Sequence, residues 1–434
     1  MSVSYLPLGS ALGNPSGAVR SACQDVARVF GVDECWFTSM GCTIFNHVVI
    51  TYARRKHHGK PVIATANPHK SLVDAATDLE VPLRFIPVGF DPTFDAMIPP
   101  TAQKVVDAIM KYPDAAALII TSPTYEGLEA NVNSIVQEVS DARPDLPVFV
   151  DNAWGSGRES PVRQGADVAL RSSHKMDGAW QGAAVMLASG ERVDRDLLRE
   201  CVSARLSSSQ SYPILCSIEE IYQLWLEYGD EFRSSLEEWG ETLTHELAQR
   251  GVRVLDRQYC AAWIADSSIT SLDARKITVA TGSANGYAVS RRLQRSGIIP
   301  EKAGPQTITF IATARLLSTD PIHFADAICD SMGATTMNLD HPPEVPLPLN
   351  QWDRLRILEM HEAFHRRTSK VSLEEAPGKV AAEVLVPYPP GIPTIIPGQL
   401  LLRDVIEYVR WLKDLGGEVM SGDRDLRTVR VVES

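Results

Sequence analysis

The sequence Ser172-Ser173-His174-Lys175 follows the short apolar run Val168-Ala169-Leu170, which we expect to be a buried strand. A lysine this close behind a buried strand can be desolvated, and a desolvated ammonium loses its proton more readily. The neutral amine of Lys175 could form a Schiff base with an aldehyde cofactor, while the adjacent hydroxyls hold its phosphate. The same four residues also fit a surface lysine at the start of a helix, so the interpretation depends on a second residue.

An aspartate upstream provides that second residue. Leu146-Pro147-Val148-Phe149-Val150 is typical of a buried strand, and Asp151 stands at its end, before Asn152-Ala153-Trp154. In pyridoxal phosphate enzymes, a carboxylate at such a strand end pairs with the pyridine nitrogen and keeps it protonated, so that the ring accepts electrons. Asp151 and Lys175, each at the carboxyl end of a predicted strand, fit this pair of roles.

Composition narrows the class of protein. The chain has 434 residues, of which 44% are hydrophobic and 22% charged, so we expect two or three globular domains. The formal net charge of -12 disfavours nucleic acid and anionic membranes as partners. No apolar run reaches membrane-spanning length and residues 1–7 do not resemble a signal peptide, which predicts a cytosolic protein. The seven cysteines have neither C-x-x-C pairing nor metal-ligand spacing, so we expect reduced thiols and no metal site.

The first half of the chain alternates between helical segments and short apolar strands. We expect helices over 19–30, 43–55, 101–111 and 133–140, and strands over 35–38, 61–64, 83–86 and 117–120. This alternation predicts an α/β domain with a mainly parallel sheet covered on both faces. Ligands collect beyond the carboxyl ends of the strands in such sheets.

The second half has a different organisation. A long amphipathic helix is expected over 218–250, followed by strands at 252–255, 263–265, 276–279 and 307–311 around a helix at 286–296. A proline-rich linker over 340–348 precedes the last segment. We therefore predict a large domain over 1–250, a small α+β domain over 251–345 and a C-terminal domain over 346–434.

Three further segments carry candidate residues. Gly41-Cys42-Thr43 follows a strand and opens a helix, which is a backbone arrangement suited to phosphate. Cys42 is either a thiol with a depressed pKa at the helix start or a small space-filling residue. His69 lies just past the strand at 61–64, where it either stacks on a flat cofactor ring or is an exposed loop residue. Residues 122–127 would line the same crevice.

Together, in this order, the segments resemble the Orn/Lys/Arg decarboxylase family, basic amino acid decarboxylases of pyridoxal-phosphate fold type I. The family reads N-G-T-S, N-x-H-K-S, T-x-x-T-Y-D-G, D-x-A-W or D-x-A-H, S-T-H-K and T-S-P-S-Y. The corresponding stretches are Met40 to Thr43, Asn67 to Ser71, Thr121 to Gly127, Asp151 to Trp154, Ser172 to Lys175, and Ser208 to Tyr212. Leu272 to Lys276 and Pro387 to Gly398 are similar to its small-domain and C-terminal motifs, so the resemblance extends from about Asn14 onward.

The resemblance implies a role for each matching residue. Lys175 would be the Schiff-base lysine, Asp151 the partner of the pyridine nitrogen, His69 the stacking residue, and His174 a neighbour of cofactor and substrate. The remaining cofactor contacts would come from Gly41, Cys42, Thr43, Ala153, Trp154 and Ser172. Ser209 would reach the cofactor phosphate of a partner subunit, which implies a homodimer with shared active sites.

Several positions depart from the family pattern. Glu126 replaces an aspartate, Asp177 replaces an apolar residue, Gln399 replaces a glutamate, and Arg315 falls where the family has a glycine. The family also has a P-G-H-K-x-G motif before the segment that begins here at Asn14, so we expect the substrate mouth to differ.

These departures leave the reaction open. We expect decarboxylation of arginine, lysine or ornithine, with Glu126 or Asp177 receiving the distal cation of the substrate. Arg315, if it reached the cofactor, would instead clamp the substrate carboxylate in plane, as in a transaminase. The alternatives are therefore an aminotransferase, an oxidase or deaminase on the same scaffold, or a regulatory homologue that binds pyridoxal phosphate without turnover.

Overall fold

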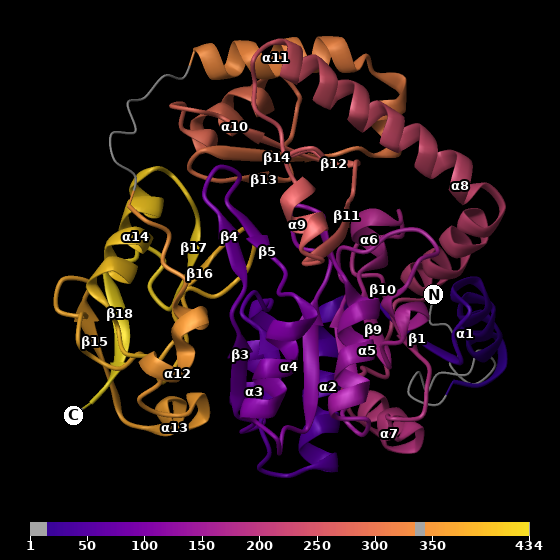
Figure 1. The fold of residues 1–434 in the computed structure, drawn as a ribbon, viewed down its shortest axis with the longest axis vertical. Coiled ribbons are helices and arrows are strands. Elements are labelled where there is room, and N and C mark those ends of the chain that lie inside the picture. The colour runs from indigo at the N-terminus through magenta and orange to yellow at the C-terminus, as the bar shows by residue number, and fades with distance from the viewer. Residues whose placement is uncertain (1–14, 335–342, 434) are drawn as a thin grey trace.

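The computed structural model describes residues 15–334 and 343–433. Figure 1 shows a large domain built on a central sheet, a small domain reached by the long helix α8 (Tyr212–Gln249), and a C-terminal domain beside the large one. The domain boundaries at residues 250 and 345 stay a prediction. Part of the expected linker, and the segment up to Asn14, lie outside the described residues.

Seven strands form the central sheet, in the order β1-β10-β9-β8-β6-β2-β3. They span Glu34–Thr38 (β1), Val62–Thr65 (β2), Leu83–Ile86 (β3), Ala117–Thr121 (β6), Val148–Asp151 (β8), Val168–Arg171 (β9) and Ala184–Ala188 (β10). Strand β10 runs antiparallel to its two neighbours, β1 and β9, and the other four adjacent pairs of this sheet are parallel. The expected mainly parallel sheet is confirmed.

Helices cover both faces of this sheet because its strands are apolar on both sides. Ile119 of β6 packs in the cluster with α2 (Cys42–Lys56), α3 (Lys70–Asp78) and α7 (Arg195–Arg205). Its neighbours Leu118 and Ile120 pack on the opposite face with α4 (Ala102–Lys111) and α5 (Val132–Ala142). The same opposite face continues under α1 (Gly17–Phe30) and the start of α8. Residues that end the parallel strands are therefore held between two packed layers.

The small domain has a three-stranded sheet in the order β12-β14-β13, with bounds Lys276–Ala280, Thr307–Ile311 and Lys302–Ala303. Helices α10 (Gly286–Arg295) and α11 (Pro321–Gly333) and the end of α8 pack on it. A separate strand, β11 (Ile269–Leu272), pairs with β7 (Leu128–Ala130) of the large domain.

Two strand predictions in this region are wrong. Residues 263–265 belong to helix α9 (Ala261–Ala265), and the segment 252–255 makes only a single bridge, between Val254 and Val279. A three-residue apolar run carries no periodicity that separates a strand from a helical turn.

The C-terminal domain packs around α14 (Arg403–Asp414) and two strand pairs. These pairs are β15 (Thr368–Ser372) with β18 (Thr428–Val432), and β16 (Val386–Pro387) with β17 (Val419–Met420). Short helices α12 (Trp352–Leu355) and α13 (Met360–His365) lie against β3 and α3 of the large domain. A hairpin of that domain, β4 (Gly89–Asp91) and β5 (Ala96–Ile98), rises between the three parts (Figure 1). No described helix combines the length and apolar character needed to cross a bilayer.

Candidate active site

A cavity of about 820 Å³ lies at the carboxyl ends of β2, β6, β8 and β9. This volume is within the range that holds a cofactor together with a small substrate. Its floor comes from the large domain and includes Asp151 and Lys175. Its rim comes partly from the C-terminal domain, through Tyr388, Ile392 and Glu418. The site is therefore completed by two parts of the chain more than 200 residues apart.

Lys175 enters the cavity from the short helix α6 (Ser173–Met176), which directly follows β9. Burial lowers the pKa of its ammonium from the ordinary value of 10.5. Its Nζ lies 4.2 Å from the ring centroid of Trp154, which lines the same cavity together with Ala153. The lysine is thus presented with an increased tendency to exist as a neutral amine.

Asp151 ends β8 and is only 6% exposed. Its Oδ1 accepts a hydrogen bond from the backbone N–H of Ala153 at 3.2 Å, and its Oδ2 accepts one from Nδ2 of Asn46 at 3.2 Å. Within residues 15–334 and 343–433 no cation is paired with this carboxylate. Buried carboxylates are normally paired with a cation. Asp151 is an exception, because the described residues supply no such partner.

His69 caps the start of α3, and its Nδ1 lies 2.8 Å from Oγ of Ser71. Burial lowers the pKa of the imidazole. The neighbouring Lys70 donates its backbone N–H to the carbonyl of Gly391 at 2.9 Å, so a C-terminal loop is fixed beside the histidine. His69 lies at the cavity wall rather than in an exposed loop. Stacking on the cofactor ring stays a proposal.

The expected phosphate loop has the backbone that its sequence suggests. Gly41 is the N-cap of α2 with φ 71°, a left-handed conformation that glycine adopts without a Cβ clash. Thr43 in the first turn and Ser172 at the N-cap of α6 line the same cavity. The N–H groups of the first turn of α2 lack partners within the helix, which suits an anion.

The hypothesis of a reactive thiol at Cys42 is wrong. Its side chain is buried, and burial together with the negative charge of Asp151 raises the pKa of the thiol to about 12. The residue fills space at the start of α2, although it does line the cavity.

His174 and Ser209 have different relations to the cavity. His174 lines it, and its Nδ1 lies 2.8 Å from the carbonyl oxygen of Ala183, so that nitrogen carries the donated proton. Burial lowers the pKa of this imidazole. Ser209 is exposed and does not line the cavity of its own chain. The next residue, Gln210, holds the loop by accepting hydrogen bonds from the backbone N–H and hydroxyl of Ser39, both at 2.7 Å.

Asp177 is not a substrate ligand in this structure. It is fully buried behind the cavity, where it pairs with Arg171 at 2.9 Å and accepts a hydrogen bond from the Tyr222 hydroxyl at 2.8 Å. The indole N–H of Trp225 donates to its backbone carbonyl at 3.0 Å. This cluster fixes the end of α6 to α8. The residue thereby stabilises the turn that carries Lys175.

Arg315 also lies outside the cavity. It is exposed in the 3-10 turn Ala314–Ser318 of the small domain and does not line the cavity of its own chain. The expected carboxylate clamp is therefore not formed by this residue within one chain.

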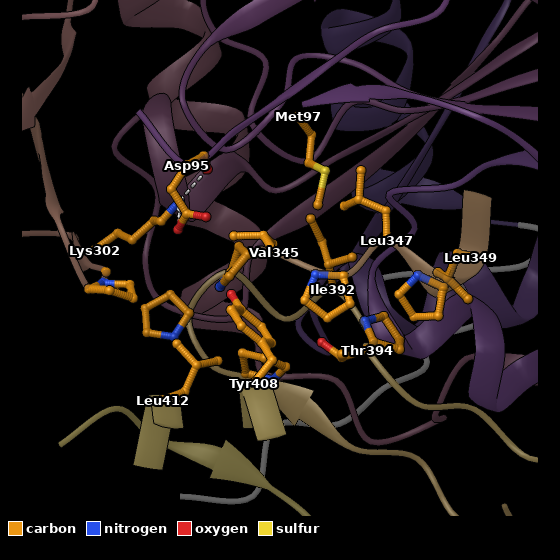
Figure 2. A pocket seen from close by; sticks show the side chains of 18 of the residues that line it. Asp95, Met97, Lys302, Val345, Leu347, Leu349, Ile392, Thr394, Tyr408 and Leu412 are labelled. Atoms are coloured by element: carbon orange, nitrogen blue, oxygen red, sulfur yellow. Dashed lines mark hydrogen bonds and ion pairs between the residues drawn. The ribbon is translucent and has the colours of Figure 1, made fainter. Parts of the chain in front are cut away.

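Glu126 lies between the main cavity and a smaller one of about 70 Å³. Its carboxylate is 2.5 Å from Nζ of Lys302, and both side chains are almost fully buried. Figure 2 shows Lys302 beside a second acid, Asp95, with Tyr408 and Leu412 of α14 closing the smaller cavity. The charge of Glu126 is compensated by Lys302, so the expected role in binding the distal cation of a substrate is not supported.

Sequence reasoning missed several residues of the cavity wall, and three of them carry polar groups that the site uses. Asn46 bonds to Asp151 from the middle of α2, Ser71 bonds to His69, and Glu418 lines the rim from beside β17. Ser71 belongs to the quoted N-x-H-K-S motif and could have been considered. Asn46 and Glu418 carry no local signal.

The residues present fit pyridoxal 5'-phosphate. Asp151 is a buried carboxylate without a cation, and a protonated pyridine nitrogen would supply one. Asn67 is a cavity residue whose buried Oδ1 has no hydrogen-bond partner among the described residues. Lys175 provides an amine for the aldehyde, and the N-terminus of α2 provides donors for the phosphate.

Comparison with known proteins gives the same assignment. The model of the Orn/Lys/Arg decarboxylase major domain matches residues 1–238, and that of the C-terminal domain of this family matches residues 358–419. Arginine decarboxylase of Bacillus subtilis (strain 168) is 26% identical over 447 residues, covering 96% of this chain and 86% of the relative. Lysine decarboxylase of Hafnia alvei is 23% identical, covering 99% and 70%.

A solved structure has the same fold. The lysine decarboxylase of Francisella novicida superimposes with a TM-score of 0.78 at 18% identity, covering 98% of this chain and 73% of that one. Because the major-domain match covers more than half of the sequence, the chain belongs to the Orn/Lys/Arg decarboxylase family of pyridoxal-phosphate-dependent carboxy-lyases.

Proposed function

We propose that this protein decarboxylates a basic amino acid, arginine, lysine or ornithine, to its amine. The bound cofactor supplies an electron sink for the electron pair left when a bond at the substrate Cα breaks. Asp151 would hold a proton on the pyridine nitrogen, His69 would pack on one face of the ring, and Lys175 would anchor the aldehyde carbon. The observation that carries the cofactor assignment is the uncompensated carboxylate of Asp151 in the cavity that Lys175 enters.

The composition of the described cavity wall favours decarboxylation over transamination. Among the described residues that line the cavity there is no arginine. A transaminase normally grips the substrate carboxylate in plane with a guanidinium fork that contacts both oxygens. Without such a fork, the described cavity wall gives the substrate carboxylate no guanidinium anchor from its own chain, which supports decarboxylation.

Glu418 is the residue that we propose receives the distal cation of the substrate. The other acids of the cavity wall are committed, because Asp74 pairs with Lys70, Glu126 pairs with Lys302, and Asp151 faces the cofactor. Glu418 is exposed at the rim, and no ion pair involving it is found within the described part of the chain. A carboxylate there is available to a guanidinium or ammonium.

The decisive experiment is a screen of the amino acids with carbon dioxide, ammonia, keto acid and peroxide all measured. We expect carbon dioxide and the amine from arginine, lysine or ornithine. Keto acid without carbon dioxide would reject the proposal. Glu418→Gln should raise KM for the basic substrate several-fold with a smaller change in kcat. The matched control is Glu407→Gln, because Glu407 is an exposed glutamate of α14 outside the cavity.

The cofactor link can be tested separately. Borohydride reduction followed by peptide mass mapping should place the cofactor mass on the peptide that contains Lys175. A cofactor mass on another lysine, such as the buried Lys276, would reject Lys175 as the anchor.

We also propose a homodimer in which Ser209 contacts the cofactor phosphate of the partner subunit. Support comes from its exposure outside its own cavity, next to the phosphate loop to which Gln210 and Ser39 connect it. Mixing inactive Lys175→Ala protomers with inactive Ser209→Tyr protomers should restore part of the activity, because one of the two sites then has all its residues. Heterodimers without any activity would argue against a shared site.

A further inference from the structure

A chain of three hydrogen bonds joins Asp151 to His69. Nδ2 of Asn46 lies 3.2 Å from Oδ2 of Asp151 and 3.0 Å from Oγ of Ser71. Oγ of Ser71 lies in turn 2.8 Å from Nδ1 of His69. Asn46, Ser71 and Asp151 are buried, and all four residues line the cofactor cavity. The carboxylate proposed to hold the pyridine nitrogen is thus connected to the imidazole proposed to cover the ring.

The donors in this chain can be assigned from chemistry. An ionised Asp151 can only accept, so the Asn46 atom that faces it must be the amide nitrogen. The second N–H of that nitrogen is then directed to Ser71, whose hydroxyl oxygen accepts it. The Ser71 hydroxyl has one proton left to donate, and its neighbour on the other side is Nδ1 of His69. If the hydroxyl donates this proton to His69, Nδ1 is the acceptor.

A second donor reaches the same ring nitrogen. The backbone N–H of Ser71 points at Nδ1 of His69 from 3.3 Å. A backbone N–H cannot reverse its direction, unlike a hydroxyl. A proton on Nδ1 would therefore face the fixed N–H of Ser71, and the Ser71 hydroxyl would have to turn its own proton elsewhere. This arrangement disfavours both the Nδ1–H tautomer and the imidazolium ion, since each of them carries that proton.

We infer that Asn46 and Ser71 are positioning residues that hold His69 neutral with its proton on Nε2. Ordered from the cofactor side, Asp151 orients Asn46, Asn46 orients the Ser71 hydroxyl, and that hydroxyl sets the tautomer of His69. No hydrogen bond to Nε2 is found within the described ranges, so this N–H is left as a fixed donor at the cavity wall. The role given to this donor rests on the proposed function, because it would face the molecule that the cavity holds.

The charges around His69 are mixed. Asp151 and Asp74 favour a positive imidazole, whereas Lys175, Lys70 and burial oppose it, and the last effect is the largest. The lowered pKa of His69 is consistent with a neutral ring. The position of the single proton is decided by the donors on Nδ1.

The tautomer can be read directly by nuclear magnetic resonance. Protein labelled with ¹⁵N in its histidines would give long-range ¹H–¹⁵N correlations, and the His69 signals would be assigned from their loss in His69→Gln. We expect the Nε2–H tautomer in both apo-protein and cofactor-loaded protein. A proton on Nδ1 in the wild type would overturn the inference without any variant.

A pair of variants tests the relay. Ser71→Ala removes the hydroxyl donor but keeps the backbone N–H at position 71. Nε2–H should therefore stay the major tautomer, while a minor Nδ1–H population appears and the pKa of His69 rises by about one unit. Thr77→Val is the control, because Thr77 is a buried hydroxyl of the same helix that donates to the carbonyl of Val73 at 2.8 Å, away from His69. We expect the His69 signals of Thr77→Val to match the wild type.

The outcomes separate this inference from the proposed reaction. Ser71→Ala with wild-type tautomer and pKa of His69 would overturn the relay, even if the enzyme released carbon dioxide. Conversely, a protein that released no carbon dioxide but had an Nε2–H tautomer sensitive to Ser71→Ala would contradict the proposed function and leave the relay intact. The measurement in apo-protein needs neither substrate nor turnover.

Discussion

Gly391 of the C-terminal domain lies directly against the imidazole of His69. A methyl group added to its α-carbon would stand 3.2 Å from Cδ2 and 3.3 Å from Nε2 of the ring, and φ of Gly391 is 86°. Gly391→Ala should therefore displace His69 and weaken cofactor binding, which a titration of the apo-protein with pyridoxal phosphate would measure.

The matched control for this substitution is Gly378→Ala. Gly378 has φ 85°, but a methyl group there meets nothing within 4 Å. Both variants should lose about 1–2 kcal/mol of unfolding free energy from backbone strain. A loss of cofactor affinity in Gly378→Ala as large as in Gly391→Ala would assign the effect to strain rather than to His69.

The Asp151→Asn variant should retain the fold and lose about 10²–10⁴-fold in kcat, because an amide cannot keep the pyridine nitrogen protonated. The apo-protein should be no less stable than the wild type, since the substitution removes a buried carboxylate that has no cation partner among the described residues. Steady-state kinetics and denaturant unfolding of the apo-protein would check both parts. Turnover near the wild-type rate would place the essential carboxylate elsewhere.

The Asp177→Ala variant should be destabilised by about 3–5 kcal/mol, because it leaves Arg171 buried without its partner. The control is Asp230→Ala, which breaks a pair with Arg158 in which the aspartate side chain is 83% exposed. We expect this control to cost less than about 1 kcal/mol. Denaturant unfolding measures the difference. A stable Asp177→Ala protein with only a raised KM would restore the substrate-ligand interpretation.

Arg315→Gly should leave the products and kcat/KM unchanged, because the arginine is exposed and outside the cavity of its own chain. Product analysis with carbon dioxide and keto acid measured in parallel would check this. A gain of carbon dioxide release in the variant would mean that Arg315 acts on the substrate, in which case it must reach a site across a subunit interface.

The lowered pKa of Lys276 predicts that the stability of the protein depends on pH. Burial lowers its pKa from 10.5 to about 7 in the folded protein, where Nζ lies 4.1 Å from the Trp154 ring centroid. Between these two values the unfolded chain binds the proton and the folded chain does not. The unfolding free energy of the wild type, relative to Lys276→Met, should therefore rise from about pH 7 to 10 and be flat below pH 7. A difference that falls over this window would contradict the lowered pKa.

The sequence located the core of the site because its signals are local. Asp151 and Lys175 each follow a short apolar strand, and parallel strands end at one edge of the sheet, so two strand ends suffice to bring them together. Asp177 was misplaced for an equally local reason. Two positions along a helical turn rotate a side chain by about 200°. Asp177, two residues after Lys175, therefore points to the opposite side of the turn from the lysine.

Other features depend on how distant segments dock. Asn46 lies within a helix whose register against β8 cannot be read from residue types, and Glu418 reaches the rim only because the C-terminal domain packs on the large domain. The exposure of Arg315 likewise follows from the path of a turn after β14. Such contacts have no sequence spacing from which to predict them.

The loop around Gly391 has a consequence for the order of events during protein synthesis. Domains generally fold from the N-terminus as the chain emerges from the ribosome. Every large-domain residue of the cavity precedes residue 183, whereas the loop that closes on His69 is made last, through Tyr388, Pro390 and Ile392. A nascent chain can thus form its sheet and expose Lys175 and Asp151 well before the wall beside His69 exists. Tight capture of the cofactor becomes a late step, available only after the segment from Tyr388 to Ile392 has been translated.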